Sequence, residues 1–365
     1  MRLLRSSAES AFARAGVSLD GSRPWDITVR DERFFRHVVM NGSLGLGESY
    51  MRRYWCADDL EELFRRLVAS GLDTTAQRSP QQLFSRLFSR ISNQQTQRKS
   101  KHNAEHHYNL GNDLFFEFLG RYKNYSCGYF RQAQTLDEAQ LAKMQRLCEL
   151  LQLTEGDRLL DVGGGWGEFA RFAATRYGCH VTSINIADEQ IAHARQYCRG
   201  TNVDIVKCDY RDLSGSYNKI AVIAMFTHVG HRNYRRFMQI MHRLLGSGGK
   251  MVMETVGGLT SKSCCEPWTN RYIFPGGMIP SMAQIDAAID GLFSRDAVEE
   301  FGQDYAVTLR QWHHNFMAAW PKLSHRYSDS MRLMFEYFFL SVAGAFRANG
   351  LLHYHIEFSR LPGRG

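Results

Sequence analysis

The 365-residue sequence contains no apolar run long enough to cross a membrane. Its hydrophobic residues make up 44% and its charged residues 22%, a balance typical of soluble globular proteins. The longest apolar stretches, 220–226 and 338–346, fall well short of the ~20 residues of a membrane span. The N-terminal segment MRLLRSSAESAFARAG lacks the apolar core and cleavage site of a signal peptide. We therefore expect a cytoplasmic protein, at most peripheral on the inner face of a membrane.

Cysteine pairs with the spacing of a metal site are also absent. The eight cysteines are scattered without a CxxC pair, and the adjacent Cys264 and Cys265 are poorly placed for a disulfide. The sequence thus predicts a reduced protein with no metal site. Zinc fingers, RNP-like motifs and lysine-rich tails are missing as well, which argues against nucleic acid as a partner.

The charge is basic and uneven. The net charge is +8, and residues 1–100 hold 16 Lys/Arg against 11 Asp/Glu. Such an excess indicates an anionic partner, here an anionic bilayer surface, although a solvated basic face without a partner has the same composition.

The segment 79–91, SPQQLFSRLFSRI, has the pattern of a basic amphipathic helix. Its apolar residues recur at helical spacing, and Arg86 and Arg90 lie at the border of the apolar face. A helix of this kind can lie on an anionic bilayer, whereas packing against the protein's own core is the alternative.

The remaining N-terminal region predicts small elements separated by turns. We expect a strand at 23–31, a short helix at 31–42 that ends at Asn41-Gly42, and a strong helix at 57–71. A polar stretch then separates this region from the rest of the chain. The predicted organisation is a smaller, mainly helical N-terminal domain at 1–92, a linker at 93–105 and a catalytic domain at 106–365.

Strand-like and helix-like segments alternate from about residue 135. This alternation predicts an α/β fold with a mostly parallel sheet and helices on both faces. After 290 we expect further helices and then one last strand at 354–360. The other expected strands contain the sequences RLLDV, HVTSIN, DIVKCD, KIAVIAMF and KMVMETV.

A glycine-rich loop follows the first of these strands. Residues 161–167 read D-x-G-x-G-x-G and stand between a strand and a helix, at the carboxyl edge of the sheet where ligands bind. No Gly-Lys-Ser/Thr follows, which excludes a P-loop, whereas dinucleotide enzymes and adenosylmethionine-dependent methyltransferases both use such a loop.

Several further segments together resemble the cyclopropane-fatty-acyl-phospholipid synthases and the related mycolic acid methyltransferases. The resemblance covers nearly the whole chain and rests on GSLGLGESYM, HHYNLGNDLFFEFLG, NYSCGYF, SINIADEQ, CDYRDL, AMFTHVGHRNY, PWTNRYIFPGG and QDYAVTLRQW. It implies a Rossmann-like class I methyltransferase fold with a seven-stranded sheet, and S-adenosylmethionine as cofactor. The implied reaction adds a methyl group to a double bond in an acyl chain of a membrane phospholipid. A carbocation forms, and its loss of a proton closes a cyclopropane, while another fate gives a methyl branch.

The resemblance also implies the site residues. A homodimer is compatible with it. Cys127 and Tyr305 would stand in the small polar site where the synthases hold a bicarbonate ion as base, with Thr227, His228 and Glu254 as further catalytic candidates. The residues expected around the cofactor are Tyr125, Ser126, Asp161, Gly163, Gly164, Gly165, Gly167, Asn185, Gln190, Asp209 and Tyr210.

Four positions depart from the family pattern. Gly164 stands for a Cys, Asn109 for an Asp, Thr227 for a Glu and Glu254 for a His. One interpretation is that Glu254, with a pKa raised by an apolar pocket, is itself the base and makes bicarbonate unnecessary. The alternative is that Glu254 only hydrogen-bonds Thr227 or His228. Nothing near Cys127 in the sequence supplies a cation that would favour its thiolate.

Two other functions remain open at this point. The loop at Gly164 should be roomier than one with a Cys, so a flavin such as FAD could bind there and, with a carboxylate base, desaturate acyl chains of phospholipids. A catalytically silent lipid-binding protein is the third interpretation.

Overall fold

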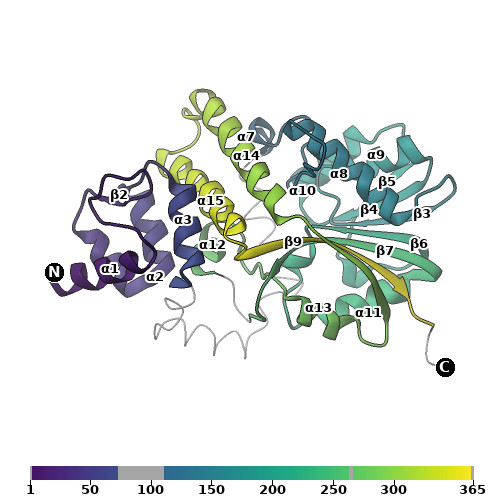
Figure 1. Cartoon of the computed structure of the whole chain (residues 1–365). Coiled ribbons are helices and arrows are strands. Elements are labelled where there is room, and N and C mark those ends of the chain that lie inside the picture. The colour runs from purple at the N-terminus through teal and green to yellow at the C-terminus, as the bar shows by residue number, and fades with distance from the viewer. Residues whose placement is uncertain (1, 73–110, 263–265, 363–365) are drawn as a thin grey trace. The chain divides into compact units, whose positions relative to one another are not determined.

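The structure is a computed structural model that describes residues 2–72, 111–262 and 266–362 (Figure 1). The predicted helix at 79–91, the linker and Asn109 lie outside the described residues. The chain divides into two compact units. The domain bounds given above stay a prediction; in this division two later ranges of the chain group with the N-terminal range. The first unit comprises Met1–Ser92, Ser263–Pro275 and Tyr305–Leu351, and the second comprises Asn93–Lys262, Gly276–Asp304 and Leu352–Gly365.

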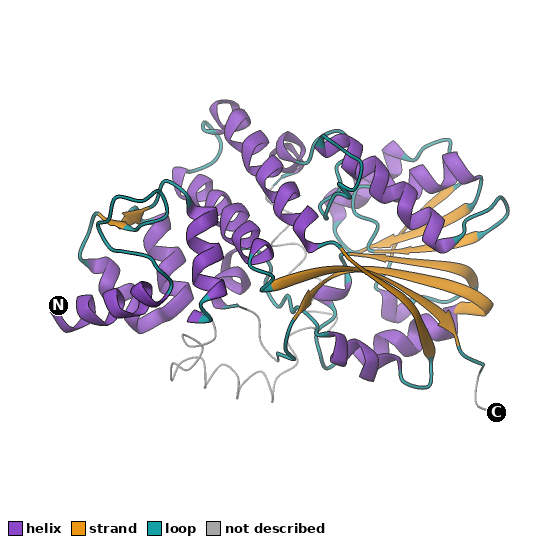
Figure 2. Cartoon of the chain, in the orientation of Figure 1, coloured by secondary structure: helices purple, strands orange, loops and turns teal. Residues whose placement is uncertain are grey.

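The second unit is built on a seven-stranded sheet (Figure 2). The strand order is β5-β4-β3-β6-β7-β9-β8, in which the pairs from β5 to β7 are parallel and β8 pairs antiparallel with β9. The α/β class and the mostly parallel, seven-stranded sheet are thereby confirmed. The strands are β3 (Arg158–Val162), β4 (His180–Asn185), β5 (Val203–Lys207), β6 (Tyr217–Ile223), β7 (Leu245–Gly258), β8 (Phe293–Glu300) and β9 (Leu351–Arg360).

Helices cover both faces of this sheet. α8 (Leu136–Leu151) and α9 (Glu168–Tyr177) pack over one core, and α11 (Tyr234–Leu244) and α13 (Met282–Ile289) over the other (Figure 1). α8 begins with a capping box, in which Thr135 and Glu138 satisfy each other's backbone N–H groups. The remaining helical elements of this unit are α7 (Asn112–Phe118), α10 (Asp188–Tyr197), η1 (Tyr210–Asp212) and η2 (Phe226–His228).

β8 corrects the prediction of helices directly after 290. Its sequence, FSRDAVEE, buries only its first residue, and most of the others are exposed. Among the described strands, β8 lies at the edge of the sheet and pairs with β9. An edge strand covered with charges carries little of the apolar alternation on which a strand prediction depends.

The first unit is mainly helical, as predicted for the N-terminal domain. Close packing joins α3 to α15: a Cβ on Gly344 would lie 2.4 Å from the carbonyl oxygen of Glu61, so only glycine fits there. The aromatic side chains of Phe335 and Phe339 are fully buried and contact Phe316, so they form core. The elements are α1 (Arg2–Arg14), β1 (Thr28–Val29), α2 (Arg33–Met51), β2 (Trp55–Cys56), α3 (Leu60–Ala69), α12 (Pro267–Tyr272), most of α14 (Gly302–Leu323) and α15 (Asp329–Arg347).

Two N-terminal predictions need correction. The strand predicted at 23–31 is reduced to the two residues of β1, because the carboxylate of Asp26 accepts hydrogen bonds from the N–H groups of Ser18 and Arg23 and folds this segment into a turn. The helix predicted at 31–42 does break at Gly42, where φ is 56° and ψ is −130°, but a second helical segment follows directly and extends α2 to Met51.

No helix among the described residues is long and apolar enough to cross a membrane.

Candidate active site

The glycine loop lies at the carboxyl end of β3, where the strand order reverses between β4 and β6. Gly163, Gly165 and Gly167 have φ angles of 88°, 54° and 92°, a region that side chains other than glycine adopt at a cost. A Cβ added to Gly165 would meet no atom of the described residues within 4 Å. The backbone at Gly165 therefore faces open space, as the approach of a ligand to this loop requires.

Gly164 corrects the expectation of a roomier loop. A Cβ at this position would lie 1.8 Å from Ser183 Oγ and 2.6 Å from Asp161 Oδ2. The hydroxyl of Ser183 donates a hydrogen bond of 2.8 Å to that carboxylate. The space beside Gly164 is thus filled by two side chains of the protein, and no extra room for a larger cofactor arises there.

Asn185 and Gln190 brace the loop. The Asn185 amide donates hydrogen bonds to the carbonyl oxygen of Gly165 at 3.2 Å and to Gln190 Oε1 at 2.9 Å. On the other side, Trp166 Nε1 donates to Asn112 Oδ1 at 2.8 Å and so ties the loop to α7. The hydrogen bonds of Asn185 and of Trp166 fix the backbone conformation of the loop.

The other expected cofactor residues lie on neighbouring elements. Asp209 follows β5 and forms an ion pair of 2.8 Å with Arg211. Tyr210 is buried in the core beneath it, and the ring of Tyr125 contacts Phe115 at a centroid distance of 5.3 Å. Asp209 is therefore held by its ion pair with Arg211, and Tyr210 is held by its packing in the core.

Asp161 is a buried residue near the carboxyl end of β3. Burial raises the pKa of Asp161 to about 6, although the hydrogen bond from Ser183 opposes this effect. Its carboxylate holds Ser183 in place beside the loop. The assignment of these residues to the cofactor stays a prediction.

A second cluster surrounds Glu254 near the carboxyl end of β7. Glu254 has no exposed surface. Its Oε1 lies 3.2 Å from His353 Nε2, and its Oε2 lies 3.7 Å from His355 Nε2. Lys143 of α8 is 1% exposed and interacts electrostatically with the same carboxylate. The alternative in which Glu254 is held by Thr227 or His228 is wrong, since its carboxylate bonds His353.

The pKa expected for Glu254 was also wrong. Burial alone would raise the pKa of this carboxyl. The charge of Lys143 is the largest opposing effect and the two histidines add to it, so the pKa of Glu254 lies below its ordinary value of 4.5. Burial lowers the pKa of Lys143, against the attraction of the glutamate. Glu254 is therefore a charged, weakly basic carboxylate in an apolar setting.

Lys143 reaches two further site residues. Its ammonium donates a hydrogen bond to Ser126 Oγ and interacts electrostatically with Cys127. The expectation that no cation lies near Cys127 is thereby corrected: the cation comes from α8 rather than from the neighbouring sequence. Lys143 thus links the loop of Ser126 and Cys127 to Glu254.

The remaining catalytic candidates are Thr227, His228 and Tyr305. Thr227 Oγ1 donates to the carbonyl oxygen of Ala224 at 3.1 Å. Burial lowers the pKa of His228 to about 4, which makes it a poor base. Tyr305 belongs to the first unit, where its ring stacks on Phe346 at 4.8 Å. Its place beside Cys127 stays a prediction.

Comparisons with known proteins identify the family of this chain. Residues 95–356 match the family model described as mycolic acid cyclopropane synthetase. The cyclopropane-fatty-acyl-phospholipid synthase of Escherichia coli K12 is 38% identical over 357 residues, which are 97% of this chain and 92% of the relative. The chain belongs to the cyclopropane synthase family. The tuberculostearic acid methyltransferase of Mycobacterium tuberculosis is 30% identical over 88% of this chain and 80% of its own.

Solved structures of the family share the fold. A cyclopropane synthase from Mycobacterium tuberculosis superposes with a TM-score of 0.66 at 25% identity, covering 71% of this chain and 97% of that one. A mycolic acid cyclopropane synthase crystallised with SAH and CTAB has a TM-score of 0.67 at 27% identity, covering 72% and 98%. The class I methyltransferase fold is thus shown.

The cluster at Glu254 contains three residues that the sequence analysis did not predict, namely His353, His355 and Lys143. His353 and His355 are two residues apart on β9, so their side chains point to the same face. This spacing could be read from the sequence. Lys143 occupies a position of the buried stripe of α8. A lysine within an apolar stripe was the available signal, because such a residue requires a buried partner.

Proposed function

We propose that this protein transfers a methyl group from S-adenosylmethionine to a double bond in an acyl chain of membrane phospholipids, giving a methyl-branched or cyclopropane product. The observation that carries the proposal is the 38% identity to the Escherichia coli synthase over 97% of the chain. The open backbone face at Gly165 supports it, because ligands of open α/β sheets bind at the carboxyl ends of the strands.

The loop residues hold the cofactor, which supplies an electrophilic methyl group. Gly165 allows close approach, while Asn185 and Gln190 keep the loop in shape. Asp209 is fixed by Arg211 at the edge of the same site. These hydrogen bonds and this ion pair hold the residues in place before the cofactor binds, which limits the cost of ordering the site.

Glu254 serves as the proton acceptor in this proposal. A carboxylate of lowered pKa is a weak base, but a carbocation is a very strong acid and needs only a charged acceptor nearby. The same weak base would be a poor match for removing a proton from a neutral allylic C–H group. The lowered pKa of Glu254 therefore favours methyl transfer over the desaturation that we had considered.

The test uses vesicles of a phospholipid with cis-monounsaturated acyl chains and adenosylmethionine with a labelled methyl group. We expect the label to enter the acyl chain, with a mass increase of one CH₂ unit for either product. Loss of two hydrogens from the chain together with flavin absorbance of the purified protein would contradict the proposal. Binding of lipid without any change of mass would identify a silent lipid-binding protein instead.

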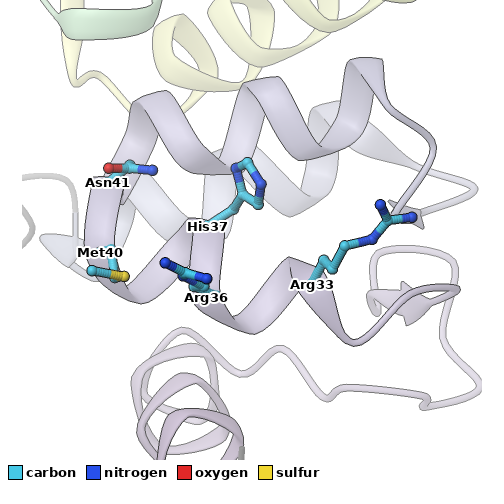
Figure 3. A pocket seen from close by; sticks show the side chains of 5 residues that line it. All are labelled: Arg33, Arg36, His37, Met40 and Asn41. Carbon is cyan, nitrogen blue, oxygen red and sulfur yellow. The ribbon is translucent and has the colours of Figure 1, made fainter.

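A surface of the first unit is suited to contact with the bilayer. Arg33, Arg36, His37, Met40 and Asn41 follow one another at helical spacing along α2 and line a pocket of about 400 Å³ (Figure 3). The apolar side chain of Met40 is 52% exposed. Cationic and apolar groups on one exposed helical face match the headgroup and acyl regions of an anionic bilayer. We propose peripheral attachment through this face.

A further inference from the structure

Glu254 can act repeatedly only if it loses each proton that it accepts. The side chain has no exposed surface, so bulk water does not reach it directly. A neutral carboxylic acid would also leave the charge of Lys143 without its counter-charge, which favours rapid loss of the proton.

We propose that Glu254, His355 and Glu299 form a proton relay that carries the proton from the buried site to the surface. This inference rests on the proposed function, because Glu254 must first take a proton from the acyl chain. The three residues come from the adjacent strands β7, β9 and β8. Glu299 and His355 are direct partners in the register of β8 and β9, which places their side chains on the same face.

The distances place His355 midway between the two carboxylates. His355 Nε2 lies 3.7 Å from Glu254 Oε2, and His355 Nδ1 lies 3.7 Å from Glu299 Oε2. Both separations exceed a hydrogen bond by about half an ångström. A small movement of the ring toward either side brings it into contact with one carboxylate at a time.

The solvent exposure of the side chains increases from Glu254 through His355 to Glu299. The side chains of Glu254 and His355 are 0% and 1% exposed, that of Glu299 is 24% exposed, and that of Arg146 beside it is 35% exposed. The ring of Phe301 covers His355 at a centroid distance of 4.3 Å. The inner part of the path is therefore shielded, and its outer end meets solvent.

Glu299 is held firmly at the outer end. Its Oε1 accepts a hydrogen bond of 2.6 Å from the Tyr129 hydroxyl, and its Oε2 accepts one of 3.1 Å from Arg146 Nε. The pKa of Glu299 is lowered to about 2, chiefly by the interaction with His355 and further by the hydrogen bonds from Tyr129 and Arg146. A proton that arrives at Glu299 therefore passes to water.

One proton moves in each cycle. Neutral His355 with a free Nε2 takes the proton from the Glu254 carboxylic acid and gives the proton on Nδ1 to Glu299, so Glu254 returns to the carboxylate. The ring then turns toward Glu299, takes a proton at Nδ1 from that carboxylic acid and gives the proton on Nε2 to the resulting carboxylate, which restores the starting tautomer before Glu299 loses its proton to water. The transfer requires a neutral ring, so turnover should rise with pH as His355 loses its charge. The titratable or charged groups facing this ring are Glu254, Glu299, His353, Tyr129 and, behind Glu254, Lys143.

The experiment compares a single turnover with steady-state turnover in wild type, Glu299→Gln and His355→Gln, using labelled adenosylmethionine and unsaturated phospholipid vesicles. The first methyl transfer needs only the charged Glu254, so its rate should stay within about twofold. Steady-state turnover should fall ~10-fold or more, since positioned proton transfer contributes ~10²–10⁴-fold. A small buffer acid and base such as imidazole should restore part of it. The matched control is Glu357→Gln, whose carboxylate is 20% exposed and pairs with Lys250 on the same strand face.

The relay would be overturned if both variants turned over at the wild-type steady-state rate. It would also be overturned if they lost the same factor in the first turnover and in the steady state. The proposed methyl transfer would stand in either case. A wild-type protein that transfers no methyl group would overturn the proposed function and the relay with it.

Discussion

The hydroxyl of Ser183 occupies the place that a side chain at position 164 would need: a Cβ on Gly164 would lie 1.8 Å from Ser183 Oγ. The two positions are therefore coupled. Gly164→Cys, which introduces the residue of the synthases, should weaken adenosylmethionine binding and lower the melting temperature. Adding Ser183→Gly removes the closer of the two clashes and leaves that with Asp161 Oδ2 at 2.6 Å, so it should recover part of both. Calorimetric titration and thermal unfolding of both single variants and the double variant measure the coupling; additive effects would show that the two positions are independent.

Gly165 offers a test of where the cofactor lies. Gly165→Ala should cost about 1–2 kcal/mol of stability, because its φ of 54° disfavours a side chain, and should also weaken cofactor binding strongly. Gly156→Ala is the matched control, since its φ of 87° is positive too and its Cβ would also meet no atom within 4 Å. The control should lose similar stability but keep its affinity in calorimetry. Equal affinities of the two variants would place the cofactor elsewhere.

Glu254 and Lys143 are buried groups that interact electrostatically, and the effect of removing one of them can be measured. Glu254→Gln should slow methyl transfer ~10²–10⁴-fold and lower the free energy of unfolding by about 3–5 kcal/mol, because a buried ammonium loses its counter-charge. The double variant Glu254→Gln with Lys143→Met should recover stability but remain inactive. Denaturant unfolding and label transfer are the two measurements, and a double variant no more stable than Glu254→Gln alone would show that the pair does not interact.

The charge of His355 predicts a pH dependence of stability. Burial would lower its pKa, but Glu254 and Glu299 outweigh burial and raise it above 6.5. The stabilisation is thus complete below pH 6.5 and is lost as pH rises through the folded pKa. The free energy of unfolding of wild type minus that of His355→Gln should therefore shrink as pH increases from 6.5 upward. Groups such as Glu168, whose pKa burial raises to about 7, titrate in both proteins and cancel in this difference. A difference independent of pH would contradict the assignment.

The surface along α2 should govern binding to anionic vesicles. Arg36→Glu should weaken binding to phosphatidylglycerol vesicles ~10-fold or more at low salt, because each basic residue near such a surface contributes about 1 kcal/mol and reversal adds repulsion. Arg199→Glu changes the net charge equally at an exposed position of the second unit and should bind nearly as wild type. Similar losses in a vesicle sedimentation assay would mean that net charge, rather than this face, attracts the bilayer.

Much of the fold was predictable because its signals are local. The buried strand β3 and the capped helix α8 carry apolar periodicity and end signals in their own sequence. β8 was missed because most of its residues face solvent, and the turn at Asp26 was missed because one side chain there replaces a strand ladder.

The site was predictable to the extent that it follows motifs. The glycine loop and Glu254 could be selected from the sequence, but their surroundings could not. Ser183 fills the space at Gly164 only because β4 lies beside β3. Lys143 and His353 come from segments far from Glu254 in the sequence, so the direction of its pKa shift depended on contacts that only the folded sheet creates.

The position of β9 has a consequence for the synthesis of the chain. β9 lies between β7 and β8 although it follows both in sequence, so β8 cannot join the sheet until β9 has been translated. At roughly 5–20 residues per second, a ribosome-bound chain holds β8 as an unpaired segment for several seconds. During that interval Glu254 also lacks both histidines. In the nascent chain β8 therefore remains open to proteolysis until β9 has been translated, and the cluster at Glu254 is completed only then.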